Sequence, residues 1–109
     1  MANTLVDVQA TFLSVDSQYS VLLAACKTPD QRTSLGSQYA AARQNYQNTL
    51  NASLEDDDAE VAALSAQLKA VNTAVVRATV QMGDIAKVID DVTTAVTLGA
   101  QLVAKAAAV

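Results

Sequence analysis

The fold of this chain is decided by residues 61–108, VAALSAQLKAVNTAVVRATVQMGDIAKVIDDVTTAVTLGAQLVAKAAA. Apolar residues recur there every three and then four positions without a slip: Val61, Leu64, Leu68, Val71, Val75, Ala78, Met82, Ile85, Ile89, Val92, Val96, Gly99, Val103 and Ala106. A mean spacing of about 3.5 residues is close to the period of an α-helix, so one helical face stays turned toward a neighbour. This stretch predicts a fold built on contacts between helices.

The main interruption in this stretch is Gly83-Asp84. A break there divides the whole chain into segments of similar length, which is the layout of a four-helix bundle. The seam crosses Gly83 without a change of phase, however, and this favours one continuous helix of about 48 residues, ~72 Å long. We therefore expect an all-α fold in which a helical hairpin packs on one long C-terminal helix, in a three-helix, coiled-coil-like arrangement. A four-helix bundle is the alternative if the chain breaks at Gly83.

The residues before the long seam predict the hairpin. A first seam repeats at the same spacing and consists of Leu5, Val8, Phe12, Val15, Tyr19, Leu22 and Cys26. Thr28-Pro29-Asp30-Gln31 then combines an N-cap, a proline at the first helical position and the glutamine of a capping box. A tight turn should therefore join two antiparallel helices. We expect helices at about residues 4–27, 29–54 and 58–108 within one domain that spans residues 1–109.

The acidic run Glu55-Asp56-Asp57-Asp58-Ala59-Glu60 separates the hairpin from the long seam. Neighbouring carboxylates repel one another inside a helix but are favourable at a helix N-terminus. We interpret the run as a connection in which one of the three aspartates caps the next helix. Weak metal binding or a docking patch is the alternative, although the run lacks the alternating ligands and the glycine of a calcium loop.

The composition argues against several functional classes. The 109 residues include no histidine and one cysteine, and the formal net charge is −4. Without histidine there is no Ser-His or Cys-His dyad and no His-based metal site, so we expect no enzyme, no cofactor and no bound metal. The basic residues are scattered, so we expect no nucleic-acid binding. Cys26 lies on the first apolar seam and is expected to be a buried structural thiol.

The N-terminal residues Met1-Ala2-Asn3-Thr4 have neither the basic region nor the apolar region of a signal peptide. The most apolar stretch, Val92 to Val109, contains threonines, a glutamine and a lysine, which make it too polar for a confident membrane span. We therefore expect a cytoplasmic protein. Export by a route that needs no cleavable signal stays open.

The candidate functional residues lie on two predicted helical faces. The first is rich in small apolar residues and consists of Ile85, Ile89, Val92, Val96, Gly99, Val103 and Ala106. It predicts either close packing within one bundle or a docking face for a second subunit or a partner helix. The second face consists of Tyr39, Arg43 and Tyr46. Tyrosine and arginine are enriched in protein interfaces, so these residues form a possible secondary partner patch, with half-buried packing as the other interpretation.

These features predict a noncatalytic helical protein–protein interaction module, such as an adaptor, inhibitor, immunity-type or chaperone-like protein. Self-association is also expected, because a half-covered apolar seam does not remain exposed to water. The alternative is an exported helical protein that assembles on or in membranes. Low charge and an Ala/Val-rich C-terminal segment suit that alternative, but polar residues interrupt every apolar run.

Overall fold

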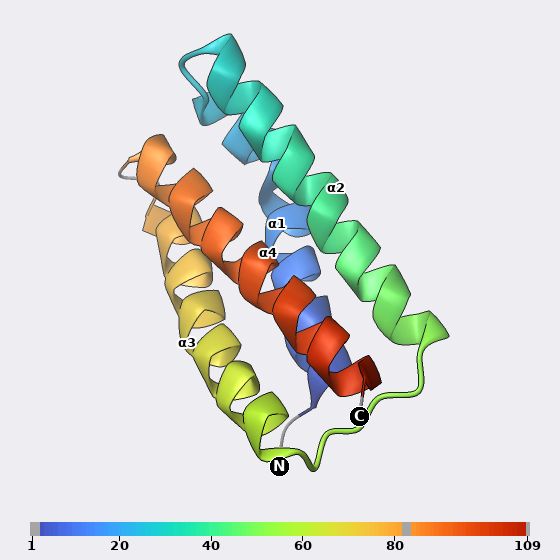
Figure 1. The fold of residues 1–109 in the computed structure, drawn as a ribbon. Helices are drawn as coiled ribbons and strands as arrows, with labels where there is room; N and C mark the ends of the chain where they lie inside the picture. The colour runs from blue at the N-terminus through green and yellow to red at the C-terminus, as the bar shows by residue number, and fades with distance from the viewer. Residues whose placement is uncertain (1–2, 82–83, 109) are drawn as a thin grey trace.

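A computed structural model of the chain describes residues 3–81 and 84–108, and it contains four α-helices. They are α1 (Thr4–Ala25), α2 (Pro29–Asn51), α3 (Ala59–Gln81) and α4 (Ile85–Ala108). Successive helices run in opposite directions, so α1 begins and α4 ends at the same end of the molecule (Figure 1). The described residues include no strand. The all-α prediction is confirmed.

The C-terminal half of the chain forms two helices rather than one. Helix α3 ends at Gln81, α4 begins at Ile85, and the two helices pack side by side (Figure 1). The expected continuous helix is therefore wrong, and the four-helix alternative is confirmed. Asp84 supplies the local reason, because its side chain accepts a hydrogen bond from the Ala86 N–H at 3.0 Å and so caps α4. Gly83, where the break was expected, lies outside the described residues.

Folding back also explains why the apolar seam keeps its phase through the break. The seam of α3 and the seam of α4 both face the same core, so no change of register is needed between them. A straight helix would leave part of this apolar surface in water, whereas the folded-back chain buries it within one molecule. The phase of a hydrophobic repeat thus does not distinguish one long helix from an antiparallel pair.

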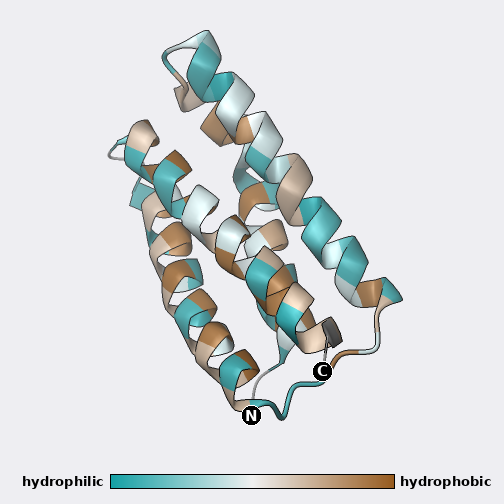
Figure 2. Ribbon diagram, in the orientation of Figure 1, coloured by the Kyte–Doolittle hydropathy of each residue, from teal (hydrophilic) through white to brown (hydrophobic). Residues whose placement is uncertain are grey.

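Helices α1 and α4 form the central pair of the bundle. Each of them contacts the other three helices, whereas the described residues of α2 and α3 do not contact each other. The cross-section is therefore a lozenge with α2 and α3 at its far corners, and the molecule measures 42 × 22 × 19 Å. Helix α2 carries mostly hydrophilic residues, as expected for a helix that covers only one side of the core (Figure 2).

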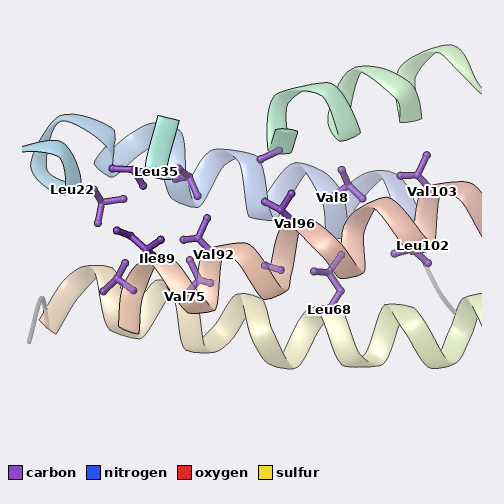
Figure 3. Close-up of a cluster of buried hydrophobic side chains, with 14 of the residues drawn as sticks. Val8, Leu22, Leu35, Leu68, Val75, Ile89, Val92, Val96, Leu102 and Val103 are labelled. Carbon is purple, nitrogen blue, oxygen red and sulfur yellow. The ribbon is translucent and has the colours of Figure 1, made fainter. Parts of the chain in front are cut away.

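The core lies around α4. Its buried side chains are all apolar: Ile85, Val88, Ile89, Val92, Ala95, Val96, Leu102, Val103 and Ala106. Figure 3 shows Val8, Leu35 and Leu68 of the other helices turned toward them. Full burial of a Val or Leu side chain contributes about 1.5–3 kcal/mol. Helix α4 therefore contributes more to this burial than any other single helix, with nine of the 18 buried apolar residues of the described chain.

The other helices alternate apolar and polar residues where they face the core. In α3 the buried apolar residues Val61, Leu68 and Val75 recur every seven positions, and so do the buried polar residues Ser65, Asn72 and Thr79. The sequence predicted that Val61, Leu68 and Val75 face the core. It also placed Leu64, Val71 and Ala78 on the same seam, and these residues are half-buried and pack against the edge of the core.

The turn between α1 and α2 follows the predicted capping chemistry. The Thr28 hydroxyl accepts a hydrogen bond from the Gln31 N–H at 3.1 Å, and Pro29 occupies the first helical position. The Gln31 side chain reaches back and accepts from the Lys27 N–H at 2.6 Å. At the start of α1 the cap is Asn3, whose side chain accepts from the Val6 N–H at 3.1 Å. The first helix therefore begins at Thr4, as expected, but Asn3 provides the cap.

Candidate interaction surfaces

The predicted docking face of α4 lies inside the bundle. Its members Ile85, Ile89, Val92, Val96, Gly99, Val103 and Ala106 are all buried against the other helices. The expectation that these residues present an exposed face assumed a long helix covered only in part. Because α4 is packed by α1, α2 and α3 together, the face belongs to the core, and a partner surface has to be sought elsewhere.

Gly99 is explained by close packing within the chain. A Cβ atom at this position would lie 3.3 Å from Nδ2 of Asn45 and 3.9 Å from a methyl group of Val8. Asn45 is buried in α2 and donates a hydrogen bond from the same Nδ2 to the Val96 carbonyl at 3.0 Å. The glycine therefore lets the side-chain amide of α2 reach the backbone of α4. Of the two interpretations of the small-residue surface, close packing within one bundle is the one observed at Gly99.

The predicted tyrosine patch packs mainly against α1. Tyr39 and Tyr46 of α2 both stack on the Phe12 ring, with ring centroids 5.8 and 5.7 Å away, and Tyr19 stacks on Tyr39 at 4.3 Å. Both tyrosine rings of the predicted patch are half-buried, whereas Arg43 between them is exposed. The aromatic rings thus hold the α1–α2 hairpin together, and Arg43 is the member of the patch that faces solvent.

The hydroxyl group of Tyr39 is bound to a carboxylate. It donates a hydrogen bond to Oδ1 of Asp16, one helix away. This hydrogen bond is the main reason why the pKa of Tyr39 is raised above its ordinary value, since the carboxylate stabilises the protonated phenol. Tyr46 accepts a hydrogen bond from Nε2 of Gln9 at 3.3 Å. Both hydroxyl groups therefore have partners within the α1–α2 hairpin.

A buried polar network joins α1 to α3, and sequence reasoning missed it. The side chain of Asp7 is 3% exposed, and its Oδ2 accepts hydrogen bonds from the Ser65 hydroxyl and the Lys69 ammonium group. Its Oδ1 forms an ion pair with Nζ of Lys69 at 3.2 Å. Asn72 donates from Nδ2 to the Asp7 carbonyl at 3.0 Å and accepts from the Thr11 hydroxyl at 2.6 Å. The seven-residue spacing of Ser65 and Asn72 beside an apolar row was the sequence signal that could have revealed it.

This network is structural in its chemistry. Asp7 and Lys69 are paired with each other across the helix interface, as are Thr11 and Asn72, and Lys69 also donates to the Ser65 hydroxyl within α3. Within the described residues, every fully buried side-chain nitrogen or oxygen has a hydrogen-bond partner. A buried polar contact that is fully satisfied selects one register and one pairing of helices rather than adding much stability. The network therefore specifies how α3 docks on α1.

The acidic run ties three helix ends together. The Asp58 carboxylate accepts from the Glu60 and Val61 N–H groups at 2.9 and 3.2 Å and so caps α3. This agrees with the prediction that one of the three aspartates caps the helix after the run. Asp56 accepts from the Thr4 N–H and hydroxyl at 3.0 and 2.6 Å, which links the run to the start of α1. The Glu55 N–H donates to the Ala106 carbonyl of α4 at 3.0 Å.

Lys105 and Glu60 add an ion pair beside this run. Their charged atoms are 2.6 Å apart, and the hydrogen bond to Glu60 raises the pKa of Lys105 above its ordinary value. Within residues 3–81 and 84–108, no group of three cysteine or carboxylate side chains is arranged to hold a metal ion. Cys26 is buried, and its thiol donates to the Leu22 carbonyl at 3.3 Å, in line with the expected structural thiol.

Three of the six exposed large apolar side chains of the described residues lie on one helix, α1. Val6, Leu13 and Val21 of α1 are 52%, 49% and 49% exposed. They lie on the side of α1 opposite Val8, which faces α4. We define the outer face of α1 as the residues on that side: Val6, Ala10, Leu13, Ser17, Ser20, Val21 and Ala24. None of them is charged. The other exposed large apolar residues of the described chain are Leu50 on α2 and Val76 and Val80 on α3.

Comparison with known proteins gives no match among family models, curated proteins or solved structures. In the described part of the chain, no helix combines the length and the apolar character needed to cross a membrane. The candidate interaction surface therefore rests on the geometry of this chain alone.

Proposed function

We propose that this chain is a noncatalytic helical protein–protein interaction module that binds its partner through the outer face of α1. The observation that carries the proposal is the exposure of Val6, Leu13 and Val21 on one side of α1, where the exposed charge at the border, Asp16, is bound to the Tyr39 hydroxyl of α2. A partner that covers this face removes apolar surface from water, and this burial is favourable by about 25 cal/mol of free energy for each Å² of apolar surface.

The contrast with α2 supports this choice of surface. Helix α2 exposes arginine, glutamine and asparagine side chains such as Arg43, Gln44 and Gln47, as expected for a helix face that stays in water. The outer face of α1 carries only valine, leucine, alanine and serine. Depletion of charged residues is the compositional mark of the centre of a protein interface.

The polar side chains that could serve chemistry are used in holding the helices together. Asp7 and Lys69 pair with each other, Asp56 and Asp58 bind helix N-termini, and the Tyr39 hydroxyl binds a carboxylate. This distribution supports a binding role in preference to a catalytic one. Because these polar groups are engaged within the bundle, recognition of a partner would rest on shape and apolar contact.

A site-specific photocrosslinker tests the proposal. We expect a crosslinking amino acid at position 13 to capture a protein in the cells that make this chain, and the same amino acid at position 50 to capture none. Leu50 is the matched control, because it is also a leucine and is 58% exposed, but lies on α2. Equal labelling at the two positions would contradict the proposal. Co-sedimentation with liposomes that Leu13→Lys abolishes would contradict it too, in favour of membrane assembly.

A further inference from the structure

We propose that the partner of the outer face of α1 is a second copy of this chain, bound so that the two α1 helices run antiparallel about a two-fold axis. This inference rests on the proposed function, since it names the occupant of the same surface. It is carried by the order of residues along that face, by the distribution of charge and by the size of the surface.

The outer face of α1 is symmetric about its middle. Leu13 lies near the centre of the helix, and Val6 and Val21 lie about two helical turns to either side of it. When two such helices pack antiparallel about a two-fold axis, the same patch on each copy meets the other. Val6 of one copy then lies opposite Val21 of the second copy, and the two Leu13 side chains meet beside the axis.

The two small residues nearest the centre of the face obey the same symmetry. Ala10 and Ser17 are equally distant from the centre of the face, so each lies opposite the other in the second copy. Large side chains therefore meet large ones and small side chains meet small ones. Small residues between the apolar contacts let two helices approach within the usual 8–10 Å between axes. A parallel two-fold pair would match each residue with its own copy, so side-chain size is compatible with both directions and the distribution of charge decides between them.

The charge distribution favours the antiparallel arrangement. Residues 55–60 together with Lys105 carry the whole formal net charge of −4, since the remaining acidic and basic residues are equal in number. All of these residues lie at the end of the bundle where α1 begins (Figure 1). An antiparallel pair places the two acidic ends at opposite ends of a molecule 42 Å long, whereas a parallel pair places them side by side. That separation far exceeds the Debye length of about 8 Å.

The surface is large enough for a dimer of modest affinity. A standard interface buries about 800 Å² per partner, and the broad side of the bundle measures 42 × 22 Å. Val76 and Val80 of α3 extend the apolar surface beyond α1, at 48% and 75% exposed. Val76 follows Lys69 by seven residues and so lies on the same side of α3, next to α1. The α3 flank therefore widens the contact that α1 begins.

Charge substitutions at Leu13 test the inference by light scattering after size exclusion and by sedimentation equilibrium. We expect the wild-type protein to reach twice its mass of 11.3 kDa with increasing concentration. Leu13→Lys and Leu13→Glu should each weaken self-association at least about tenfold, since like charges meet beside the axis. An equimolar mixture of the two variants should restore the dimer. Leu50→Lys is the control and should dimerise like the wild type.

A second pair of variants tests the direction of the helices. In the antiparallel arrangement Val6→Lys combined with Val21→Glu places opposite charges together, whereas Val6→Lys combined with Val21→Lys places like charges together. We expect the first double variant to dimerise at least about tenfold more tightly than the second. The reverse order, or equal affinities, would overturn the antiparallel arrangement. Circular dichroism confirms that each variant keeps its helical content.

The outcomes separate this inference from the proposed function. A wild-type protein that stays monomeric at millimolar concentration, while position 13 crosslinks to a different protein, overturns the inference and leaves the interaction module standing. Crosslinks from position 13 to the same chain support both. A monomer without crosslinks overturns both.

Discussion

The same substitution, glycine to alanine, is expected to have opposite effects at the two helical glycines of the described chain. Gly36 lies inside α2 and Gly99 inside α4, so alanine adds helix propensity worth about 1 kcal/mol at either position. At Gly36 the added Cβ would lie 3.5 Å from the Tyr19 hydroxyl, an ordinary contact distance. Gly36→Ala should therefore stabilise the protein by about 0.5–1 kcal/mol.

At Gly99 the new methyl group meets a fixed neighbour. It would lie 3.3 Å from Nδ2 of Asn45, so this amide has to retreat by a few tenths of an ångström. The amide is held by its hydrogen bond to the Val96 carbonyl at 3.0 Å, and both groups are buried. Leaving a buried donor unsatisfied costs about 1–3 kcal/mol, which exceeds the gain in propensity. We expect Gly99→Ala to destabilise the protein by about 1 kcal/mol.

Thermal and urea unfolding followed by circular dichroism measure this difference. For a domain of this size a change of 1 kcal/mol moves Tm by roughly 4 °C, so the two variants should differ by about 8 °C with the wild type between them. The double variant Gly99→Ala with Asn45→Ala should be more stable than Asn45→Ala alone, because the obstructing amide is gone. Equal stabilisation by the two glycine substitutions would refute the packing argument.

Three further predictions concern single contacts. Asp56→Ala should lower the free energy of unfolding by about 1 kcal/mol, because it removes the carboxylate that binds the start of α1, whereas Asp57→Ala on the exposed side of the same run should have almost no effect; urea unfolding compares them. Asp16→Asn should lower the pKa of Tyr39 toward its ordinary value of 10.0, measured by phenolate absorbance in an alkaline titration. In the wild type this raised pKa contributes stability below pH 10, and that stability is lost as the pH rises through the folded-state pKa. A Tyr39 titration midpoint that Asp16→Asn leaves unchanged would argue against the contact. Leu68→Ala should cost about 2–5 kcal/mol in the same urea assay, because this leucine is fully buried between α3 and α4.

The helices were predictable because their signals are local. Thr28 and Pro29 mark the start of α2 by capping chemistry that acts within one turn, and the structure places the helix there. The apolar row of α3 was also predictable, since its period is a property of the helix itself. The fold back between α3 and α4 was not, because the phase of the seam is the same in both arrangements. The Asp84 cap permits the break, and the packing of α4 against three helices stabilises the folded-back arrangement.

The site was less predictable than the fold. The sequence left two interpretations of the face around Val96 open, a docking face or close packing within the bundle, and the face lies inside, because burial depends on how many neighbours a helix has as well as on its own sequence. The network around Asp7 was missed for the related reason that a buried carboxylate needs partners from another helix. Ser65 and Lys69 are 58 and 62 residues away in sequence. The seven-residue spacing of Ser65 and Asn72 indicates a polar row on α3, but it does not specify Asp7 as the partner.

The most informative property of α1 is that it carries large apolar residues on both of its sides. It buries Val8, Val15 and Leu22 together with the polar residues Thr4, Asp7 and Thr11, and it exposes Val6, Leu13 and Val21. In an isolated bundle the exposed side gains nothing from these valines and leucine, whereas charged residues there would improve solubility. The buried polar side is already satisfied by α3 and by the acidic run, so it does not account for the apolar residues opposite. A helix that is packed on one side and carries exposed apolar residues on the other is the arrangement expected between two interfaces. The first interface is the contact with the rest of the chain, and the second is the one that we propose and that Leu13→Lys tests.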